Sequence, residues 1–366
     1  MNIKHPVYQP SMKGNELNYV TECIESTWIS SKGKFITAFE NSFANYIHVG
    51  YATSVCNGTV ALHLALLSLG IHNDDEVIVP SFTYIASVNA ITYVGAIPVF
   101  VDSVPQTWQI DCRDVAKKIT PKTKAIIAPH IYGHPCDMDD LVSICKKNGL
   151  FLIEDCAEAL GSKYNNKHVG TFGDISAYSF FGNKTITTGE GGMVVSNSKE
   201  LIERVKKLKN QGLSTRQYWH DEVGYNFRMT NICAAIGLAQ MERADQIIAD
   251  KIRIASQYRK AFENTVIEFH GEASNTFNSY WMCSILVPNF SQRDELRSFL
   301  EEEGIETRPL FYPVHEMPMY TRFATEEFPV ARNISYRGIN LPSYPDLTND
   351  EVKFISSKVK QFFQIK

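Results

Sequence analysis

Short apolar runs alternate with helix-like segments over much of the chain, and this alternation constrains the fold more than any other feature. The runs at residues 76–80, 97–102, 125–130 and 150–155 are rich in Val, Ile and Phe and have the length of buried strands. Residues 138–148 are predicted to form a helix between the last two runs. Because a helical crossover makes successive strands parallel, we expect a mostly parallel sheet with helices on both faces.

The two ends of the chain follow other patterns. We expect residues 1–50 to form an entry arm and amphipathic helices, with Pro10 and Ser11 capping a helix over about residues 14–26. The later predicted elements are a basic helix at 199–209, a long helix at 231–263, a strand at 280–287, a helix at 293–302 ended by Gly304, and a terminal helix from about residue 349. These patterns predict a large α/β domain at residues 1–245 and a small α+β domain at residues 246–366.

Composition argues against several classes of protein. The net charge is −4 over 366 residues, so nothing indicates a nucleic-acid or membrane surface. No apolar run approaches the ~20 residues of a transmembrane helix, and the first residues lack the apolar core of a signal peptide, so a cytoplasmic location is expected. The eight cysteines include no Cys-x-x-Cys pair and the histidines do not cluster, so we predict no metal site and no disulfide framework.

Residues 178–195 hold one lysine, Lys184, in a loop between two apolar runs, followed by a glycine-rich turn. A lysine held between buried strands loses solvation, which lowers the pKa of its amine and makes it a nucleophile towards carbonyls. Asp155 ends the run at 150–155, where open α/β sheets bind ligands. Such a lysine and carboxylate, together with a phosphate cradle, are what a pyridoxal phosphate (PLP) site needs. The alternative is an ordinary loop lysine whose amine reaches water.

Residues 52–64 supply a candidate phosphate cradle. They have the pattern of a strand, a tight turn containing Asn57, Gly58 and Thr59, and a helix. Backbone N–H groups at a helix N-terminus bind phosphate well, and Thr59 adds a hydroxyl group. Many strand-to-helix turns contain Gly-Thr, so this pattern alone leaves a plain turn open.

Three motifs together resemble the cofactor signature of the DegT/DnrJ/EryC1-type sugar aminotransferases. They are Glu-Asp-Cys-Ala-Glu-Ala at 154–159, Ser-Phe-Phe-Gly-Asn-Lys at 179–184 and Thr-Gly-Glu-Gly-Gly at 188–192. The resemblance covers nearly the whole chain and implies an aspartate-aminotransferase-like fold (fold type I) with PLP as cofactor. It implies that Lys184 binds PLP covalently and that Asp155 pairs with the pyridine nitrogen. A dehydratase branch of the family has histidine at the lysine position, so Lys184 favours amino transfer.

The same resemblance implies further contacts to PLP. Tyr84 is expected to stack on the ring, although a core aromatic is the alternative, and Glu158 to lie near the 3′-oxygen. Asn226 is expected to reach the PLP phosphate of the other subunit, which implies a homodimer with its active site at the interface, or a higher oligomer built from it. The full set of expected cofactor contacts is Asn57, Gly58, Thr59, Tyr84, Asp155, Glu158, Ser179, Lys184 and Asn226.

The implied reaction is a ping-pong transamination that uses L-glutamate and a keto sugar nucleotide. The resemblance is closest to enzymes that aminate C4 of GDP-4-keto-6-deoxy-D-mannose for O-antigen synthesis. A dTDP- or UDP-linked sugar, or a different sugar carbon, is the serious alternative, because no physical rule applied to these residues separates the bases. The candidate substrate contacts, for each of which packing or a surface role is an equal alternative, are Ser31, Trp219, Arg308, Tyr312 and His315.

Two other functions fit the sequence less well. A nicotinamide oxidoreductase needs a G-x-G-x-x-G turn that opens a helix, whereas Gly189-Glu190-Gly191-Gly192 differs from this pattern and precedes a strand-like run. A non-catalytic PLP-binding regulator would need a DNA-binding segment, and the chain has neither spare length nor a basic region for one. Both alternatives are much weaker than an aminotransferase.

Overall fold

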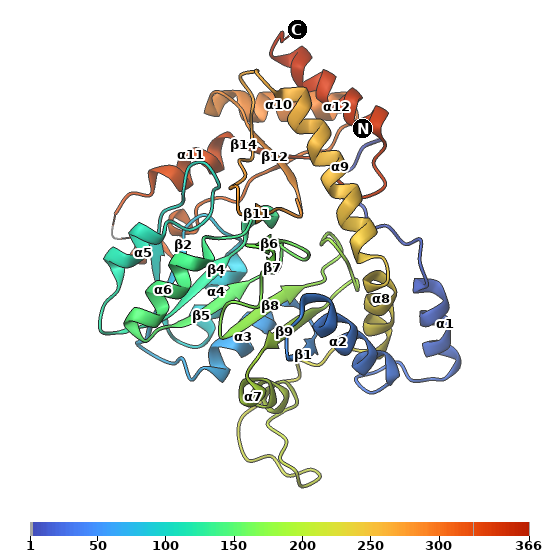
Figure 1. Cartoon of the computed structure of the whole chain (residues 1–366), viewed down its shortest axis with the longest axis vertical. Helices are drawn as coiled ribbons and strands as arrows, with labels where there is room; N and C mark the ends of the chain where they lie inside the picture. Colours follow the sequence, from blue (N-terminus) through green and yellow to red (C-terminus); the bar gives the residue numbers. More distant parts are fainter. Residues whose placement is uncertain (1–2, 325, 366) are drawn as a thin grey trace.

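The computed structural model describes residues 3–324 and 326–365, and its largest element is a seven-stranded sheet of order β1-β9-β8-β5-β4-β2-β3 (Figure 1). The strands are β1 (Tyr51–Val55), β2 (Glu76–Pro80), β3 (Ile97–Val101), β4 (Thr123–Pro129), β5 (Phe151–Asp155), β8 (Ile175–Ser179) and β9 (Gly192–Ser196). Neighbouring strands from β3 to β8 pair in parallel, and β9 is antiparallel to both of its neighbours. This confirms the expected mostly parallel sheet.

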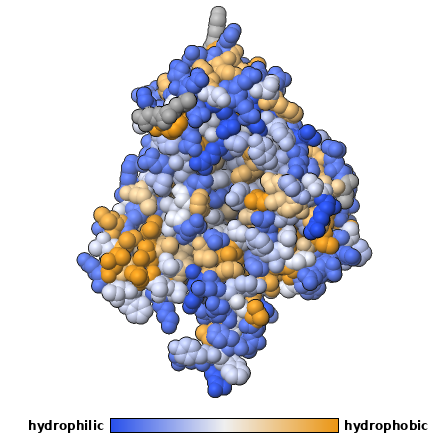
Figure 2. Space-filling model, turned by 180° about the vertical axis from the view of Figure 1, so that it is seen from behind, coloured by the Kyte–Doolittle hydropathy of each residue, from blue (hydrophilic) through white to orange (hydrophobic). Residues whose placement is uncertain are grey.

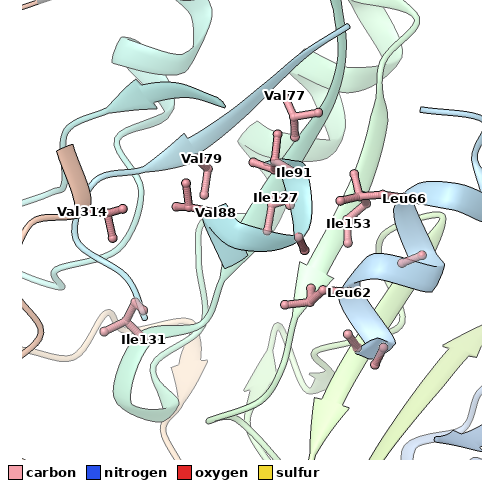
Figure 3. Close-up of a cluster of buried hydrophobic side chains, with 14 of the residues drawn as sticks. Leu62, Leu66, Val77, Val79, Val88, Ile91, Ile127, Ile131, Ile153 and Val314 are labelled. Atoms are coloured by element: carbon pink, nitrogen blue, oxygen red, sulfur yellow. The ribbon is translucent and has the colours of Figure 1, made fainter. Parts of the chain in front are cut away.

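Both faces of this sheet are buried, which explains why its strands are apolar throughout. In β2, Val77 and Val79 enter one hydrophobic cluster and Ile78 enters another on the opposite face. Figure 3 shows the first cluster, where Leu62 and Leu66 lie near Ile153 and Val88 lies beside Val79.

Helices cover the two faces in separate groups. One group, α3 (Gly58–Ser68), α4 (Ile85–Tyr93) and α7 (Lys199–Lys209), packs on the face of Val77. The other group is α2 (Lys34–Ile47), α5 (Cys112–Lys118), α6 (Met138–Asn148) and α8 (Asn231–Met241). The predicted bounds of α6 and α7 are confirmed, and each begins after a side-chain cap, Asp137 and Ser198 respectively.

The C-terminal part forms a second, antiparallel sheet of order β10-β12-β14-β13. Its strands are β10 (Glu268–Phe269), β12 (Cys283–Leu286), β13 (Arg308–Pro309) and β14 (Gly338–Leu341), and its helices are α9 (Ala244–Phe262), α10 (Phe290–Glu302), α11 (Pro329–Arg337) and α12 (Asn349–Phe362). Helices α9, α10 and α12 share a core with this sheet. The predicted terminal helix is confirmed, and Thr348 and Glu351 form its capping box.

Short elements connect these parts. Strands β6 (Lys163–Tyr164), β7 (Lys167–His168) and β11 (Thr276–Phe277) form a three-stranded sheet, and the 3-10 helices are η1 (Ile131–Gly133), η2 (Val314–Glu316) and η3 (Thr321–Phe323). Because β11 belongs to the C-terminal part, its pairing with β6 joins the two regions. The predicted division at residues 245 and 246 falls in the first turn of α9 and stays a prediction.

The start of the chain lies against the C-terminal part. The N–H groups of Lys4 and His5 donate to the carbonyl of Gly304, and the N–H group of Ser343 donates to Val7. The predicted cap at Pro10 and Ser11 is wrong. The first helix, α1, covers Glu16–Glu25 after Asn15, because the hydroxyl group of Ser11 instead binds Asp346.

Two further predictions need correction. The long helix expected at 231–263 is two helices, α8 and α9, separated at Glu242 and Arg243. Glu242 accepts hydrogen bonds from Asn15 and Tyr19, so the break is a docking point for the N-terminal region. The strand expected at 280–287 is shorter, because Tyr280 has a left-handed φ of 50° and β12 begins only at Cys283. Across residues 3–324 and 326–365, no helix has both the length and the apolar character needed to cross a membrane.

Candidate active site

A cavity of about 650 Å³ lies where β2, β4, β5 and β8 end or lead into their following loops. The carboxyl edge of a parallel sheet is where open α/β folds bind ligands. Residues of the C-terminal part also line the cavity, among them Trp281, Arg308 and Asn340. The site is therefore built between the two regions.

Lys184 lies in this cavity, in the loop between β8 and β9. Its N–H group donates to the carbonyl of Phe181, 2.9 Å away, and its own carbonyl accepts from the hydroxyl group of Tyr8. The side chain is 11% exposed, and Nζ is 3.9 Å from Oε1 of Glu158. The amine also lies 3.7 Å from the centroid of the Trp281 ring. The backbone fixes the lysine, and its amine faces a carboxylate and an aromatic ring.

Burial changes the protonation of this pair. It lowers the pKa of the Lys184 amine, against the opposing influence of Glu158 and Asp155. Burial also raises the pKa of Glu158 to about 7, although Lys184 and the N–H group of Tyr132 act in the other direction. Both groups therefore exchange protons more readily near neutral pH than exposed lysine and glutamate do.

Asp155 ends β5, is buried and lines the cavity. Its Oδ2 accepts a hydrogen bond from the hydroxyl group of Ser87, at 2.7 Å, and its Oδ1 accepts one from the N–H group of Ala157, at 3.1 Å. Donors on both oxygens fix the orientation of the carboxylate.

The turn before α3 forms a cradle that requires glycine. A Cβ atom on Gly58 would lie 2.7 Å from Cβ of Ser179, and one on Gly192 would lie 2.6 Å from the backbone of Asn57. Oδ1 of Asn57 caps α3 by accepting from the N–H group of Val60, at 3.0 Å. The N-terminus of α3 therefore has exposed backbone N–H groups, and glycines let neighbouring backbone lie close to it. Such an arrangement fits a phosphate group. With the Lys184 amine and the Asp155 carboxylate, the cradle completes a set of groups that fits PLP.

Nine of the predicted site residues line the one cavity: Asn57, Gly58, Thr59, Tyr84, Asp155, Glu158, Ser179, Lys184 and Arg308. Five others lie outside it within one chain: Ser31, Trp219, Asn226, Tyr312 and His315. Asn226 accepts from Arg228, Tyr312 contacts Arg293, and His315 is 2.5 Å from the hydroxyl group of Ser81.

Sequence reasoning missed four residues of the site. Ser87 orients Asp155. Trp281 lies against the Lys184 amine, Tyr132 packs on Trp281, and Phe311 packs on Tyr132. Ser87 lies three residues after the predicted ring contact Tyr84, near the start of α4, and this short spacing is the signal that could have found it. Trp281 was assigned to a strand, and nothing local in the sequence indicates its contact with a lysine 97 positions earlier.

A buried group of His130, Glu154 and Cys156 has ligand atoms within 4.8 Å of one another. The oxygens of Glu154 already accept hydrogen bonds from His130 and from three backbone N–H groups, those of residues 170, 172 and 173. Because both oxygens of Glu154 already accept hydrogen bonds, the carboxylate ties the loop at 170–173 to β5. We therefore assign His130, Glu154 and Cys156 a structural role.

The fold and the lysine-containing cavity define a PLP-dependent aminotransferase. A family model described as the DegT/DnrJ/EryC1/StrS aminotransferase family matches residues 10–360. The chain therefore belongs to this family, which confirms the resemblance seen in its motifs. Membership implies a sugar substrate and an amino donor.

Individual proteins agree with this assignment. The chain is 59% identical over 362 residues to the GDP-perosamine synthase of Escherichia coli O157:H7, covering 99% of both chains. It is 53% identical over 362 residues to the GDP-perosamine synthase of Vibrio cholerae, covering 98% of this chain and 99% of the relative. Among solved structures, the PLP form of the putative sugar aminotransferase Spr1654 from Streptococcus pneumoniae superimposes with a TM-score of 0.94, at 26% identity, covering 100% of this chain and 99% of that one. These matches confirm the predicted fold type and cofactor.

Proposed function

We propose that this protein transfers the amino group of L-glutamate to C4 of GDP-4-keto-6-deoxy-D-mannose, giving GDP-perosamine and 2-oxoglutarate. The observation that carries the reaction type is the buried Lys184 amine, held in a cavity with Asp155 and a phosphate cradle. The choice of sugar rests on the full-length similarity to two GDP-perosamine synthases. The product would serve O-antigen synthesis in the cytoplasm.

When bound, PLP supplies a carbonyl that reacts with amines and a ring that accepts the electrons of a broken C–H bond. The residues of the chain then have separate tasks. The cradle at Gly58 and Thr59 would hold the phosphate group, with Asn57 and Ser179 beside it. Tyr84 would face the ring, and the Asp155 carboxylate, oriented by Ser87, would keep the ring nitrogen protonated.

Lys184 is the proposed general base and acid. Its lowered pKa leaves more of the amine uncharged near neutral pH, so the amine can accept the proton released from the donor's Cα. Glu158, 3.9 Å away, attracts the ammonium group that results. The amine then returns the proton to a neighbouring carbon within the same cavity.

Arg308 is the proposed anion contact of the substrate. Its guanidinium group lines the cavity and bonds to Oε1 of Glu306, 3.3 Å away, while remaining partly exposed. The planar guanidinium group can donate two parallel hydrogen bonds, which suits a carboxylate or a diphosphate. Tyr312 and His315 have their contacts elsewhere, so the proposed substrate set does not include them.

The proposed assembly is a homodimer that shares its active sites, from which a higher oligomer can be built. The segment after α7, residues 211–226, projects from the body of the molecule (Figure 1), and its surface mixes hydrophilic and hydrophobic residues (Figure 2). It carries Trp219, which is exposed, and Asn226. Ser31 lies in another surface loop, next to the exposed Trp28. Ser31, Trp219 and Asn226, which lie outside the cavity of their own chain, would line the cavity of the partner.

An absorbance titration tests the reaction and the substrate together. L-glutamate is expected to remove the absorption band of protein-bound PLP, and GDP-4-keto-6-deoxy-D-mannose to restore it. Restoration only by a dTDP- or UDP-linked keto sugar would keep the aminotransferase and reject the substrate. Absence of a PLP band after the cofactor is supplied would reject the whole proposal. Full activity of a dilute monomer, measured by light scattering alongside turnover, would reject the shared site.

A further inference from the structure

The ring of Trp281 lies against the Lys184 amine, at 3.7 Å from Nζ to the ring centroid. Trp281 comes from the segment between β11 and β12, and it is buried. The predicted function assigns it no task. Its position is nevertheless closer to the amine than the 3.9 Å that separates Nζ from Oε1 of Glu158.

Three contacts hold the indole in this position. Its Nε1–H group donates to the carbonyl of Asn183, at 2.7 Å, so the ring is tied to the residue that precedes the lysine. Tyr132 is nearly parallel to it, with centroids 6.0 Å apart and an angle of 10°. Phe311 lies within 6.4 Å at 26°. These contacts fix the orientation of the ring relative to the loop that carries the lysine.

The same aromatic group is bonded to Glu158. The N–H group of Tyr132 donates to Oε2 of Glu158, at 2.7 Å, and the Tyr132 hydroxyl group accepts from the N–H group of Phe311, at 3.1 Å. One connected unit therefore presents both a carboxylate and an aromatic face to Lys184. Two segments of the C-terminal part, around residues 281 and 311, belong to this unit.

An aromatic face attracts an ammonium group and is indifferent to an uncharged amine. The lysine is uncharged when it accepts a proton and is an ammonium group while it carries that proton. The charged groups that act on the amine are Glu158 and Asp155. The other titratable groups lining the cavity are Tyr84, Tyr93, His130, Tyr178, Glu190 and Arg308. Burial disfavours the charged form, and the ring opposes this.

We propose that Trp281 is a positioning residue, whose ring face holds the proton-carrying form of the Lys184 amine at the reaction centre. The proposal rests on the proposed function, because it gives Lys184 the role of proton carrier. It predicts that loss of the ring lowers the affinity of the amine for its proton. A residue that serves only packing would change stability without changing this affinity.

The test measures the protonation of Lys184 directly in the full chain freed of PLP. Isotope-labelled formaldehyde and cyanoborohydride methylate uncharged amines, and mass spectrometry of the peptide containing Lys184 gives its rate of labelling from pH 6 to 10. Lys353, whose side chain is 75% exposed, is the reference in the same digest. Neither PLP nor a sugar is needed, so failure of the proposed function does not affect this result.

Two variants carry the test. Trp281→Leu keeps an apolar side chain without a ring. In this variant the apparent pKa of Lys184 is expected to fall by about one unit. Below that pKa, the larger uncharged fraction makes labelling up to about tenfold faster. Trp281→Phe keeps a weaker face and loses the bond to Asn183, so a smaller fall is expected. Phe262→Leu is the control, since this buried ring stacks on Tyr258 in the core of the C-terminal part, away from the cavity, and should leave the labelling of Lys184 unchanged.

The outcomes separate the alternatives. An unchanged pKa in both Trp281 variants, or a rise caused by water entering the cavity, would overturn the proposal. If Trp281→Leu does not fold, as judged by circular dichroism, Trp281→Phe alone decides by the same criterion. In the PLP-loaded enzyme, the saturating rate of the L-glutamate half-reaction is expected to fall about tenfold in Trp281→Leu, with little change in the glutamate concentration giving half of that rate. A tenfold rise in the half-saturating glutamate concentration, with the saturating rate unchanged, would also contradict a role in proton transfer.

Discussion

Two buried lysines, Lys184 and Lys251, show how surroundings separate a reactive amine from a structural one. Lys251 lies in α9, is fully buried, and donates to the carbonyl of Ser343 at 2.8 Å. Burial lowers the pKa of both amines, to about 8 for Lys251. Lys251 is bound to a backbone carbonyl, whereas Lys184 lines a cavity and faces Glu158. A lowered pKa is therefore common to both lysines and does not identify the catalytic one. The feature that distinguishes Lys184 is that its amine lines a cavity beside a carboxylate.

The largest expected effect is that of Lys184→Ala. Loss of the amine removes both covalent attachment and proton transfer, so amino transfer should fall by at least about a thousandfold. The fold should persist, because the bond from the Tyr8 hydroxyl group reaches the backbone carbonyl of residue 184 and survives the substitution. Turnover is measured with L-glutamate and the keto sugar nucleotide, and Tm by calorimetry. Lys353→Ala, at an exposed site, is the control. Retained turnover in Lys184→Ala would assign the chemistry to another residue.

Lys251→Met is expected to act on stability instead. The folded pKa, about 8, lies below the ordinary value of 10.5, so between these pH values the unfolded chain binds more protons than the folded one. The free energy of unfolding therefore rises from pH 8 to 10.5, by up to about 3 kcal/mol. Below pH 8 the folded protein carries the buried Lys251 charge, which destabilises it most there.

Methionine has no proton to bind, so the difference in unfolding free energy between the wild type and Lys251→Met should change with pH in this window. Urea unfolding of both proteins at pH 7, 8, 9 and 10 measures it. Turnover should stay within about threefold of the wild type, because Lys251 does not line the cavity. A difference that does not vary with pH would show that the pKa of this amine is not lowered in the folded protein.

Glu158→Gln should slow the reaction much less than Lys184→Ala does. Glutamine keeps an oxygen for the N–H group of Tyr132 but removes the charge beside Lys184. We expect about a tenfold slower half-reaction with L-glutamate at pH 8. The wild-type rate should also show an ionisation near pH 7 that the variant lacks, since the pKa of Glu158 is raised to about 7. Stopped-flow absorbance across pH 6–9 measures both, and identical pH profiles would contradict the proposed role of Glu158.

Local signals predicted the parts of the molecule that local residues determine. The bounds of α6 and α7 follow from side-chain caps and apolar spacing, and Lys184, Asp155 and Gly58 belong to motifs a few residues long. The errors occur where distant segments meet. The helix break at Glu242 depends on Asn15 and Tyr19, and no local pattern could place Trp281 against the lysine.

The pairing of the chain's first segment with its last third has a consequence for synthesis. The N–H group of Val7 donates to Glu306, 299 positions later, and Tyr8, next in sequence, bonds to the lysine loop. On the ribosome, residues 4–8 emerge long before residues 304–306, the partners of residues 4–7, have been translated. The loop that carries the reactive amine is therefore secured only late in translation, and a truncated product would contain Lys184 without this support.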